Sequence, residues 1–303
     1  MKRAPRIGIA LGSGSARGWA HVGVLRALAR EGIEPQIIAG CSIGAFVGAV
    51  AAAGDLEKLG GWVETLGWQD VVGLMDMGLR GGLIKGDKLI TFFERNFVDR
   101  DFVSLGRSFG CVATDLQSGH EVWLREGSVS AAVRASIALP GLLTPSWQDG
   151  RLLVDGGLVN PVPVSLARAM GADIVIAVDL NSDVVGAAWR NRPEPERSPD
   201  GANGWSKRLL ARFGRSEPAP SEAPPPEPSE SLPSMLTVMQ SSISIMSVRI
   251  ARSRLAGEPA DVLISPRLAQ LGLMDYHRGA EAIAEGEAAV EVALPSIRRA
   301  LAH

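Results

Sequence analysis

Residues 6–53 read RIGIALGSGSARGWAHVGVLRALAREGIEPQIIAGCSIGAFVGAVAAA, and this stretch decides the fold. Two short apolar runs, Arg6–Leu11 and Gln36–Ala39, have the length and composition of buried strands. Each is followed by a helix-like segment: Gly18–Glu31 has apolar residues at helical spacing, and Ile43–Ala53 is an alanine-rich run able to pack tightly. Strand, helix, strand and helix within about fifty residues predict an α/β fold with a mostly parallel central sheet and helices on both of its faces.

The rest of the chain continues this alternation. We predict further helices over Asp87–Asn96, Val129–Leu139 and Arg278–Ala302. We predict strands over Phe109–Thr114, His120–Leu124, Leu152–Val154, Ile174–Val178 and Asp261–Ile264, the first two of them forming a hairpin. Apolar residues between Leu232 and Ile250 recur at spacings of four and three, which predicts a helix with one face buried against the core. The alternative for that helix is a partner-binding coiled coil.

Residues 186–231 differ from the rest in composition. They contain nine of the nineteen prolines, and such a segment cannot bury enough apolar surface to offset its ordering entropy. Because strand and helix signals continue on both sides, we predict a single domain over residues 1–303 with a disordered insertion at 186–231. Within it, Gly204–Arg215 has apolar residues at helical spacing and several basic ones. That pattern allows either a solvated linker or a short helix lying on an anionic membrane.

Composition and charge exclude several classes of protein. Lys+Arg 31 against Asp+Glu 33 and a mean hydropathy of +0.12 are unlike a nucleic-acid-coating or disordered chain. With two cysteines, Cys41 and Cys111, no disulfide framework or metal-site spacing is present, so we expect no metal, no cofactor and a reduced cytoplasmic setting. The longest apolar run is too short to span a bilayer, so any membrane contact should be peripheral.

The pentapeptide Gly40-Cys41-Ser42-Ile43-Gly44 fits the pattern G-x-S-x-G between a predicted strand and a predicted helix. Gly40 and Gly44 allow a sharp turn, so that the Ser42 hydroxyl stands clear of the sheet beside the positive end of the next helix. The pattern therefore indicates a nucleophile elbow, the alternative being an ordinary glycine-rich turn.

A serine hydroxyl needs a base to accept its proton. No histidine has the glycine loop at a strand end that usually presents a catalytic base, so we interpret all four as structural or solvated. They are His21, His120, His277 and His303. Asp155 follows a strand-like run and precedes Gly156 and Gly157. A partly buried carboxylate there can act as a general base, although Asp-Gly is also a common turn pair.

A second glycine-rich loop, Gly12-Ser13-Gly14-Ser15-Ala16-Arg17-Gly18, joins the first strand to the first helix. Small residues at a helix N-terminus leave amide donors free for a phosphate or for the oxyanion of an acyl-transfer intermediate. A dinucleotide site is not expected, because the third glycine is one residue late and no acidic residue ends the second strand. A Walker-type loop is not expected either, since Gly-Lys-Ser/Thr is missing.

These three motifs, in this order, resemble the patatin-like phospholipase family. LGSGSARGWAHVGVLRAL followed by IIAGCSIGAFVGA looks most like its small bacterial RssA-type branch, and the resemblance extends through Arg134–Gly141 and Asp155–Pro163. It implies a three-layer α/β/α fold. It also implies that Ser42 is the acyl-forming nucleophile and that Asp155, in an Asp-Gly-Gly motif, is its base without a histidine.

The resemblance further implies that backbone amides of Gly12, Ser13 and Gly14 form the oxyanion hole, while Arg17 and Gly18 support the loop. The sequence departs from the common family pattern by having Ser13 and Ser15 where glycines are frequent. We expect the backbone donors to survive this change only if those two serines keep φ below zero.

The activity implied is hydrolysis of fatty-acyl esters of phospholipids or lysophospholipids through an acyl-enzyme, with no calcium. The partners implied are an acyl-ester lipid and no nucleic acid, in the cytoplasm, with peripheral contact at the inner membrane surface left open; nothing predicts an oligomeric state. Two alternatives remain: a thioesterase or acyltransferase using a small acyl donor, and a regulatory, partner-binding protein with incidental esterase activity.

Overall fold

The computed structural model describes residues 4–76, 82–183 and 235–302. An eight-stranded sheet forms the middle layer, in the order β10-β9-β1-β2-β4-β8-β7, with β5 also pairing with β4. Its strands are β1 (Ile7–Leu11), β2 (Ile37–Cys41), β4 (Ser108–Asp115), β5 (Glu121–Leu124), β7 (Ser146–Gln148), β8 (Arg151–Asp155), β9 (Ile174–Val178) and β10 (Val262–Ile264). The run from β10 to β4 is parallel, whereas β5, β7 and β8 pair antiparallel. The predicted mostly parallel sheet is therefore confirmed.

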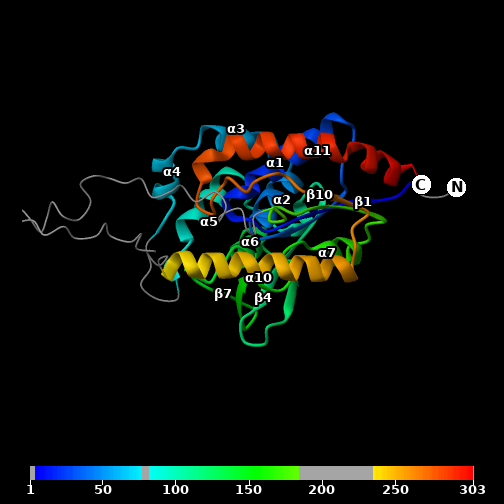
Figure 1. The fold of residues 1–303 in the computed structure, drawn as a ribbon. Helices are drawn as coiled ribbons and strands as arrows, with labels where there is room; N and C mark the ends of the chain where they lie inside the picture. Colours follow the sequence, from blue (N-terminus) through cyan, green and yellow to red (C-terminus); the bar gives the residue numbers. More distant parts are fainter. Residues whose placement is uncertain (1–3, 77–81, 184–234, 303) are drawn as a thin grey trace, which may run out of the picture.

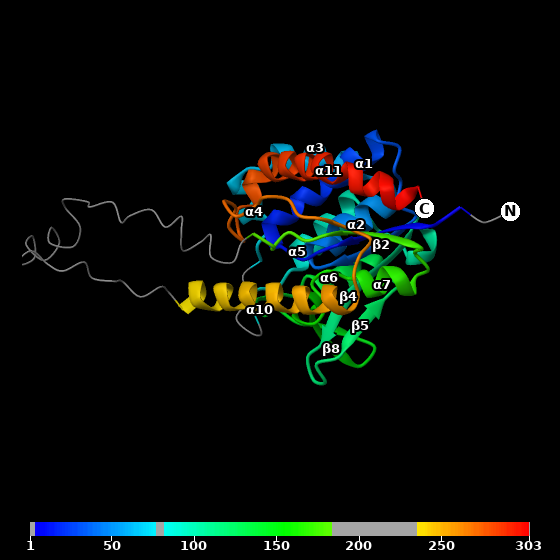
Figure 2. The same ribbon diagram turned by 45° about the vertical axis from the view of Figure 1, so that its right-hand side comes forward.

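Helices cover both faces of this sheet, as Figures 1 and 2 show. The α-helices are α1 (Ala20–Arg30), α2 (Ile43–Ala53), α3 (Leu56–Thr65), α4 (Trp68–Gly73), α5 (Asp87–Asn96), α6 (Val129–Ser136), α7 (Val164–Ala169), α10 (Met235–Gly257) and α11 (Gly279–Leu301). Short 3₁₀ turns lie at Ser15–Trp19, Phe102–Ser104, Gly156–Leu158 and Tyr276–Arg278. A two-stranded sheet pairs β3 (Gly82–Ile84) with β6 (Gly141–Leu143).

Side chains of the buried strands point alternately to the two faces of the sheet, which explains why the fold has three layers. In β1, Ile9 and Leu11 belong to the large core that they share with α1, α2 and α11, while Ala10 belongs to a smaller core on the opposite face with α7. Successive residues of a strand point to opposite faces, so an uninterrupted apolar run needs cover on both sides. The predicted three-layer α/β/α arrangement is confirmed.

The register around β4 explains how two distant parts of the chain meet. One edge of β4 pairs with β5, and the other edge pairs first with β2 and then with β8. Cys41, at the end of β2, lies opposite Val112, and Asp155, at the end of β8, lies opposite the next residue, Ala113. Because β2 runs parallel and β8 antiparallel to β4, the two strands meet end to end. Ser42, which follows Cys41, is thereby brought to Asp155.

Two of the predicted helices differ in detail. α6 ends at Ser136 instead of Leu139, because the chain turns there and the Ala138 carbonyl accepts a hydrogen bond from the Asp155 amide at 3.0 Å. The prediction of a buried apolar stripe on α10 is wrong for Met239 and Met246, which are 37% and 50% exposed, whereas Ile243 and Ile250 of the same stripe are partly buried. Among the side chains described on this helix, those of Val248 and Ala251 are buried. Apolar side chains occur around much of this helix, so their spacing does not select one face.

Strands from both sides of residues 184–234 belong to one sheet, since β9 precedes that stretch, β10 follows it, and the two pair in parallel. The segments on either side of this stretch therefore share one sheet. The proline-rich stretch 186–231 and the amphipathic segment Gly204–Arg215 lie outside the described residues.

Candidate active site

Ser42 occupies a strained turn between β2 and α2, with φ of +55° and ψ of −124°. Such a positive φ is rare for a residue with a side chain and is found preferentially at functional sites. Gly40 and Gly44 make the turn possible: a Cβ on Gly44 would collide with the carbonyl of Leu11, and one on Gly40 with the backbone of Ala45. Glycine, predicted at both positions, is therefore required because a side chain at either one would collide with the neighbouring backbone.

Ser136 holds this turn against the sheet. The Ser42 amide donates to Oγ of Ser136 at 2.9 Å, and the Ser136 hydroxyl donates to the Val112 carbonyl at 2.7 Å. Ser136 is fully buried. Ser136 lies in the stretch that carries the family resemblance, but its role was not predictable, because a serine in a helix shows no sign of the distant amide from which it accepts a hydrogen bond.

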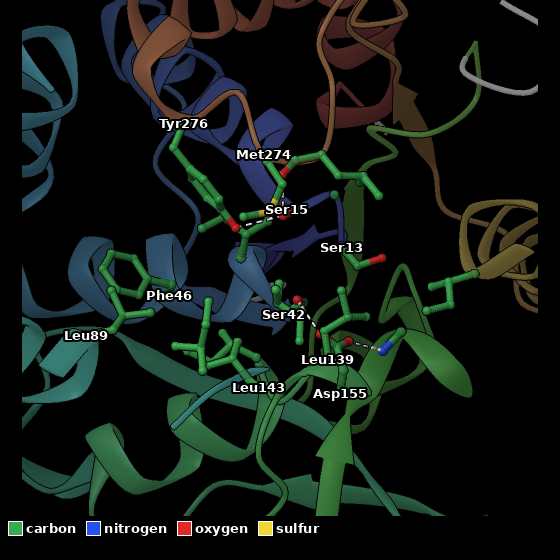
Figure 3. A pocket seen from close by; sticks show the side chains of 18 of the residues that line it. Ser13, Ser15, Ser42, Phe46, Leu89, Leu139, Leu143, Asp155, Met274 and Tyr276 are labelled. Carbon is green, nitrogen blue, oxygen red and sulfur yellow. Dashed lines mark hydrogen bonds between the residues drawn. The ribbon is translucent and has the colours of Figure 1, made fainter. Parts of the chain in front are cut away.

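Asp155 faces Ser42 directly, as Figure 3 shows. The Ser42 hydroxyl donates to Oδ2 of Asp155 at 2.6 Å, and the Gly157 amide donates to Oδ1 at 2.7 Å. Gly156 is required at the turn, since a Cβ there would collide with the backbone of Val112. Both carboxylate oxygens thus have a donor, and Oδ2 is aligned to take the proton of Ser42.

Burial controls the charge of this carboxyl group. Desolvation raises the pKa of Asp155 from 3.8 to about 6, while the hydrogen bonds from Ser42 and Gly157 oppose the rise. A carboxyl group with this pKa is ionised at neutral pH and is a stronger base than an exposed aspartate. The adjacent Cys41 is also buried, and desolvation raises the pKa of its thiol, so it does not compete as a thiolate.

The loop over residues 12–18 contradicts part of the predicted oxyanion hole. The Gly12 amide donates to the Val178 carbonyl at 3.1 Å and the Ser13 amide to the Pro161 carbonyl at 2.8 Å, so neither is free for a substrate. Within the described residues, the amides of Gly14 and Ser15 have no acceptor. Carbonyls of β9 and of the segment before α7 take up the first two amides, which leaves the next two without a partner in the described residues.

Ser15 also departs from the expected conformation. Its φ is +52°, so Ser15 does not meet the condition that both serines keep φ below zero. Its side chain has partners that support this conformation: Oγ of Ser15 contacts the Leu273 carbonyl and the Tyr276 hydroxyl, each at 2.7 Å. Tyr276, which belongs to none of the motifs recognised in the sequence, lies in the site.

Arg17 supports the loop through the side chain of Asn181. Its Nη1 donates to Oδ1 of Asn181 at 2.7 Å, and Nδ2 of Asn181 donates to the Ser13 carbonyl at 2.7 Å. Burial lowers the pKa of Arg17 to about 10, so the guanidinium stays charged at neutral pH. Gly18 allows the loop to approach α2, since a Cβ there would collide with the side chain of Ile43.

His21 is fully buried and contacts the same loop from behind. Its Nε2 lies 2.7 Å from the Gly12 carbonyl. Burial lowers the pKa of His21 to about 4, so the ring is neutral at pH 7 and Nε2 must carry the proton that the carbonyl accepts. This geometry agrees with a structural role.

The space above Ser42 is an apolar pocket (Figure 3), lined by residues from α2, α3, α4, α5, β3 and β6. Its apolar lining includes Phe46, Trp62, Val71, Ile84, Leu89 and Leu143. Ile243 of α10 closes another part of it. An alkyl chain matches this lining better than a polar group does, because burying a polar group there without a hydrogen bond is costly.

No group of three or more His, Cys, Asp or Glu in the described residues is arranged to hold a metal ion. No helix in the described part of the chain is long and apolar enough to cross a bilayer.

Comparison with known proteins identifies the family. A family model described as patatin-like phospholipase matches residues 9–168. An uncharacterised NTE family protein of Mycobacterium tuberculosis is 36% identical, over 96% of this chain and 91% of that protein. The chain belongs to the patatin-like phospholipase family. Family membership confirms the predicted resemblance, whereas the RssA-type branch stays a prediction.

Other proteins to which this chain is similar are longer. The patatin-like phospholipase domain-containing protein 7 of Rattus norvegicus is 34% identical over 66% of this chain, which corresponds to 15% of that protein. The crystal structure of VipD from Legionella pneumophila covers 97% of this chain and 67% of its own, with a TM-score of 0.47 and 13% identity.

Proposed function

We propose that this chain is a serine acyl hydrolase that cleaves fatty-acyl esters of phospholipids or lysophospholipids through a Ser42–Asp155 dyad. The observation that carries the proposal is the 2.6 Å hydrogen bond from the Ser42 hydroxyl to Asp155 at the base of an apolar pocket. A nucleophile, its base and a space suited to an alkyl chain meet at one point. Membership in a phospholipase family supports the same activity.

The first half of the reaction forms an acyl-enzyme. Oγ of Ser42 attacks the ester carbonyl carbon while its proton passes to Oδ2 of Asp155. The amides of Gly14 and Ser15, which have no acceptor in the described residues, are the donors we assign to the resulting oxyanion, together with the amide of Ile43 that follows the nucleophile. When the tetrahedral intermediate collapses, the alcohol leaves with the proton from Asp155.

The second half regenerates the enzyme. Asp155 takes a proton from water as the water oxygen attacks the acyl carbonyl carbon, and the same amides again stabilise the oxyanion. Collapse of this intermediate releases the fatty acid, and Oγ of Ser42 recovers its proton from Asp155. The raised pKa of Asp155 suits both directions of transfer, because it lies close to neutral pH.

Covalent labelling tests the nucleophile and the base. A fluorophosphonate probe should label the wild-type protein and should fail to label Ser42→Ala, while Asp155→Asn should be labelled at least about a hundredfold more slowly. Ser244→Ala, which removes another hydroxyl from the pocket lining, is the matched control and should label normally. Equal labelling of Ser42→Ala and wild type would refute the assignment.

Substrate profiling separates the proposal from its enzymatic alternative. We expect release of fatty acid from a lysophospholipid or a phospholipid to exceed hydrolysis of the matching acyl-coenzyme A. Faster turnover of the thioester would favour a thioesterase or acyltransferase. Leu89→Asp should suppress long-chain esters more than acetyl esters, because a charge in the apolar pocket disfavours an alkyl chain.

We infer a single domain over 1–303, interrupted by the insertion at 186–231, acting in the cytoplasm with peripheral access to membrane lipid. A purely regulatory, partner-binding role would require that labelling of Ser42 be absent or without consequence for lipid turnover.

A further inference from the structure

Ser15 is assigned as an oxyanion donor, but its backbone conformation is unfavourable for a residue with a side chain. Its amide is one of the donors assigned to the oxyanion, and its φ of +52° lies in the left-handed region. Glycine adopts that region freely, whereas a residue with a Cβ is disfavoured there. A serine in this position therefore needs contacts that stabilise its conformation.

The Ser15 side chain provides such contacts, and their direction follows from the number of protons. Oγ of Ser15 lies 2.7 Å from the Leu273 carbonyl and 2.7 Å from the Tyr276 hydroxyl. A carbonyl only accepts, so the single proton of Ser15 is donated to Leu273. The hydroxyl of Tyr276 must then donate to Ser15. Figure 3 shows Tyr276 reaching Ser15 across the upper side of the pocket.

The segment that contains Leu273 and Tyr276 is itself hydrogen-bonded to Ala16 and Trp19, just before α1. The Ala16 amide donates to the Leu273 carbonyl at 3.2 Å, and Nε1 of Trp19 donates to the Tyr276 carbonyl at 3.2 Å. The rings of Trp19 and Tyr276 also meet edge to face, with centroids 6.0 Å apart. Residues between β10 and α11 are thus attached to the loop at several points.

Building on the proposed function, we propose that Tyr276 and Leu273 hold Ser15 in its left-handed conformation and so direct the amides of Gly14 and Ser15 toward the oxyanion. Ser15 and Tyr276 are positioning residues in this arrangement. Neither side chain takes part in bond making; both determine where the backbone donors of the loop point.

Two substitutions at residue 15 isolate the backbone effect. Ser15→Ala and Ser15→Gly both remove the hydroxyl and leave Tyr276 without its acceptor, but only alanine keeps the Cβ. We expect Ser15→Ala to lower kcat by about five- to thirtyfold with little change in KM, because its amides lose their alignment. Ser15→Gly should lose clearly less kcat than Ser15→Ala, because glycine adopts this conformation without support.

Tyr276→Phe removes the donated hydrogen bond and keeps the ring against Trp19. We expect a smaller fall in kcat, about three- to tenfold, because Leu273 still accepts from Ser15. In the Ser15→Gly background the same substitution should have no further effect. This loss of additivity is the signature of a shared role.

The protein contains one tyrosine, which gives a direct spectroscopic readout. A ¹³C-tyrosine label produces the signal of Tyr276 alone, and this signal should shift to a similar position in Ser15→Ala and Ser15→Gly. Thermal unfolding of each variant checks that it folds. An unchanged tyrosine signal in a folded variant would show that the hydrogen bond is missing in solution and would overturn the proposal.

Ester hydrolysis and the rate of fluorophosphonate labelling supply the kinetic result. Equal losses in Ser15→Ala and Ser15→Gly, or additive losses with Tyr276→Phe, would overturn the positioning role. These outcomes differ from failure of the proposed function, in which the wild type itself would not be labelled or would be labelled equally after Ser42→Ala.

Discussion

Oγ of Ser42 donates a hydrogen bond to Oδ2 of Asp155 over 2.6 Å, although 113 positions separate the two residues in the chain. They meet because β2 and β8 approach end to end along one edge of β4. Ser42 comes immediately after β2 and Asp155 is the last residue of β8. The register in which β2 and β8 pair with β4 therefore determines the distance between the two side chains.

Acylation should depend on the ionisation of Asp155. With a pKa of about 6, the carboxylate is lost as pH falls through that value, and kcat/KM should fall about tenfold per pH unit below it. Activity should level off above it. Labelling rates measured between about pH 4 and about pH 8 test this. A profile governed by a group with a pKa near that of an ordinary exposed aspartate would contradict the assigned base.

Asp155→Asn should stabilise the fold at neutral pH. The folded protein keeps a proton on Asp155 between pH 3.8 and about 6 that the unfolded chain has released. The wild type therefore loses stability as pH rises through this window, and the asparagine variant does not. The gain in melting temperature should grow with pH up to about 6 and stay constant above it.

Asp115→Asn is the control for this effect. A hydrogen bond from the Gln117 amide lowers the pKa of Asp115, so its carboxylate contributes stability above its unfolded-state pKa. Its replacement should lower the melting temperature at neutral pH, the opposite sign from Asp155→Asn. A gain in both variants would point to a general effect of removing negative charge.

His21→Leu should destabilise the protein without abolishing acylation. The substitution leaves the buried Gly12 carbonyl without its donor, which costs about 1–3 kcal/mol of unfolding free energy. Fluorophosphonate labelling should remain, because His21 lies behind the loop with its Nε2 bound to that carbonyl. His21→Gln, which keeps a donor, should recover part of the stability. Loss of labelling as complete as in Ser42→Ala would make His21 part of the catalytic machinery.

Asn181→Ala should lower both stability and kcat. Asn181 joins the buried Arg17 guanidinium to the Ser13 carbonyl, and its loss leaves a charged donor without this acceptor, at a cost of about 1–3 kcal/mol. The oxyanion loop loses its brace at the same time. Urea unfolding and ester hydrolysis measure the two effects.

Gln36→Ala is the matched control for Asn181→Ala. The Gln36 side chain also bridges two backbone groups, accepting from the Ile7 amide and donating to the Glu34 carbonyl. It lies at the opposite end of β1 and β2 from Ser42. We expect a loss of stability with unchanged kcat. An equal fall in kcat in both variants would remove the loop-specific interpretation of Asn181.

Local patterns were enough to predict most elements. Ile43–Ala53, Asp87–Asn96 and Ile174–Val178 were predicted with the bounds that the structure has. Each of these predictions depends only on residues that are neighbours in the chain. The exposure of Met239 and Met246 on α10 was not predictable in this way, because what covers a helix depends on the elements it packs against.

The sequence by itself determined the layered α/β architecture, Ser42 in its glycine-flanked turn and Asp155 at a strand end, since each depends on residues close together in the chain. Only the tertiary structure decided which amides of the loop are free. Gly12 and Ser13 lose theirs to carbonyls of Val178 and Pro161, far along the chain. It also brought Tyr276 to Ser15. A backbone donor is available only where the folded chain leaves it without an acceptor, and no local pattern records that.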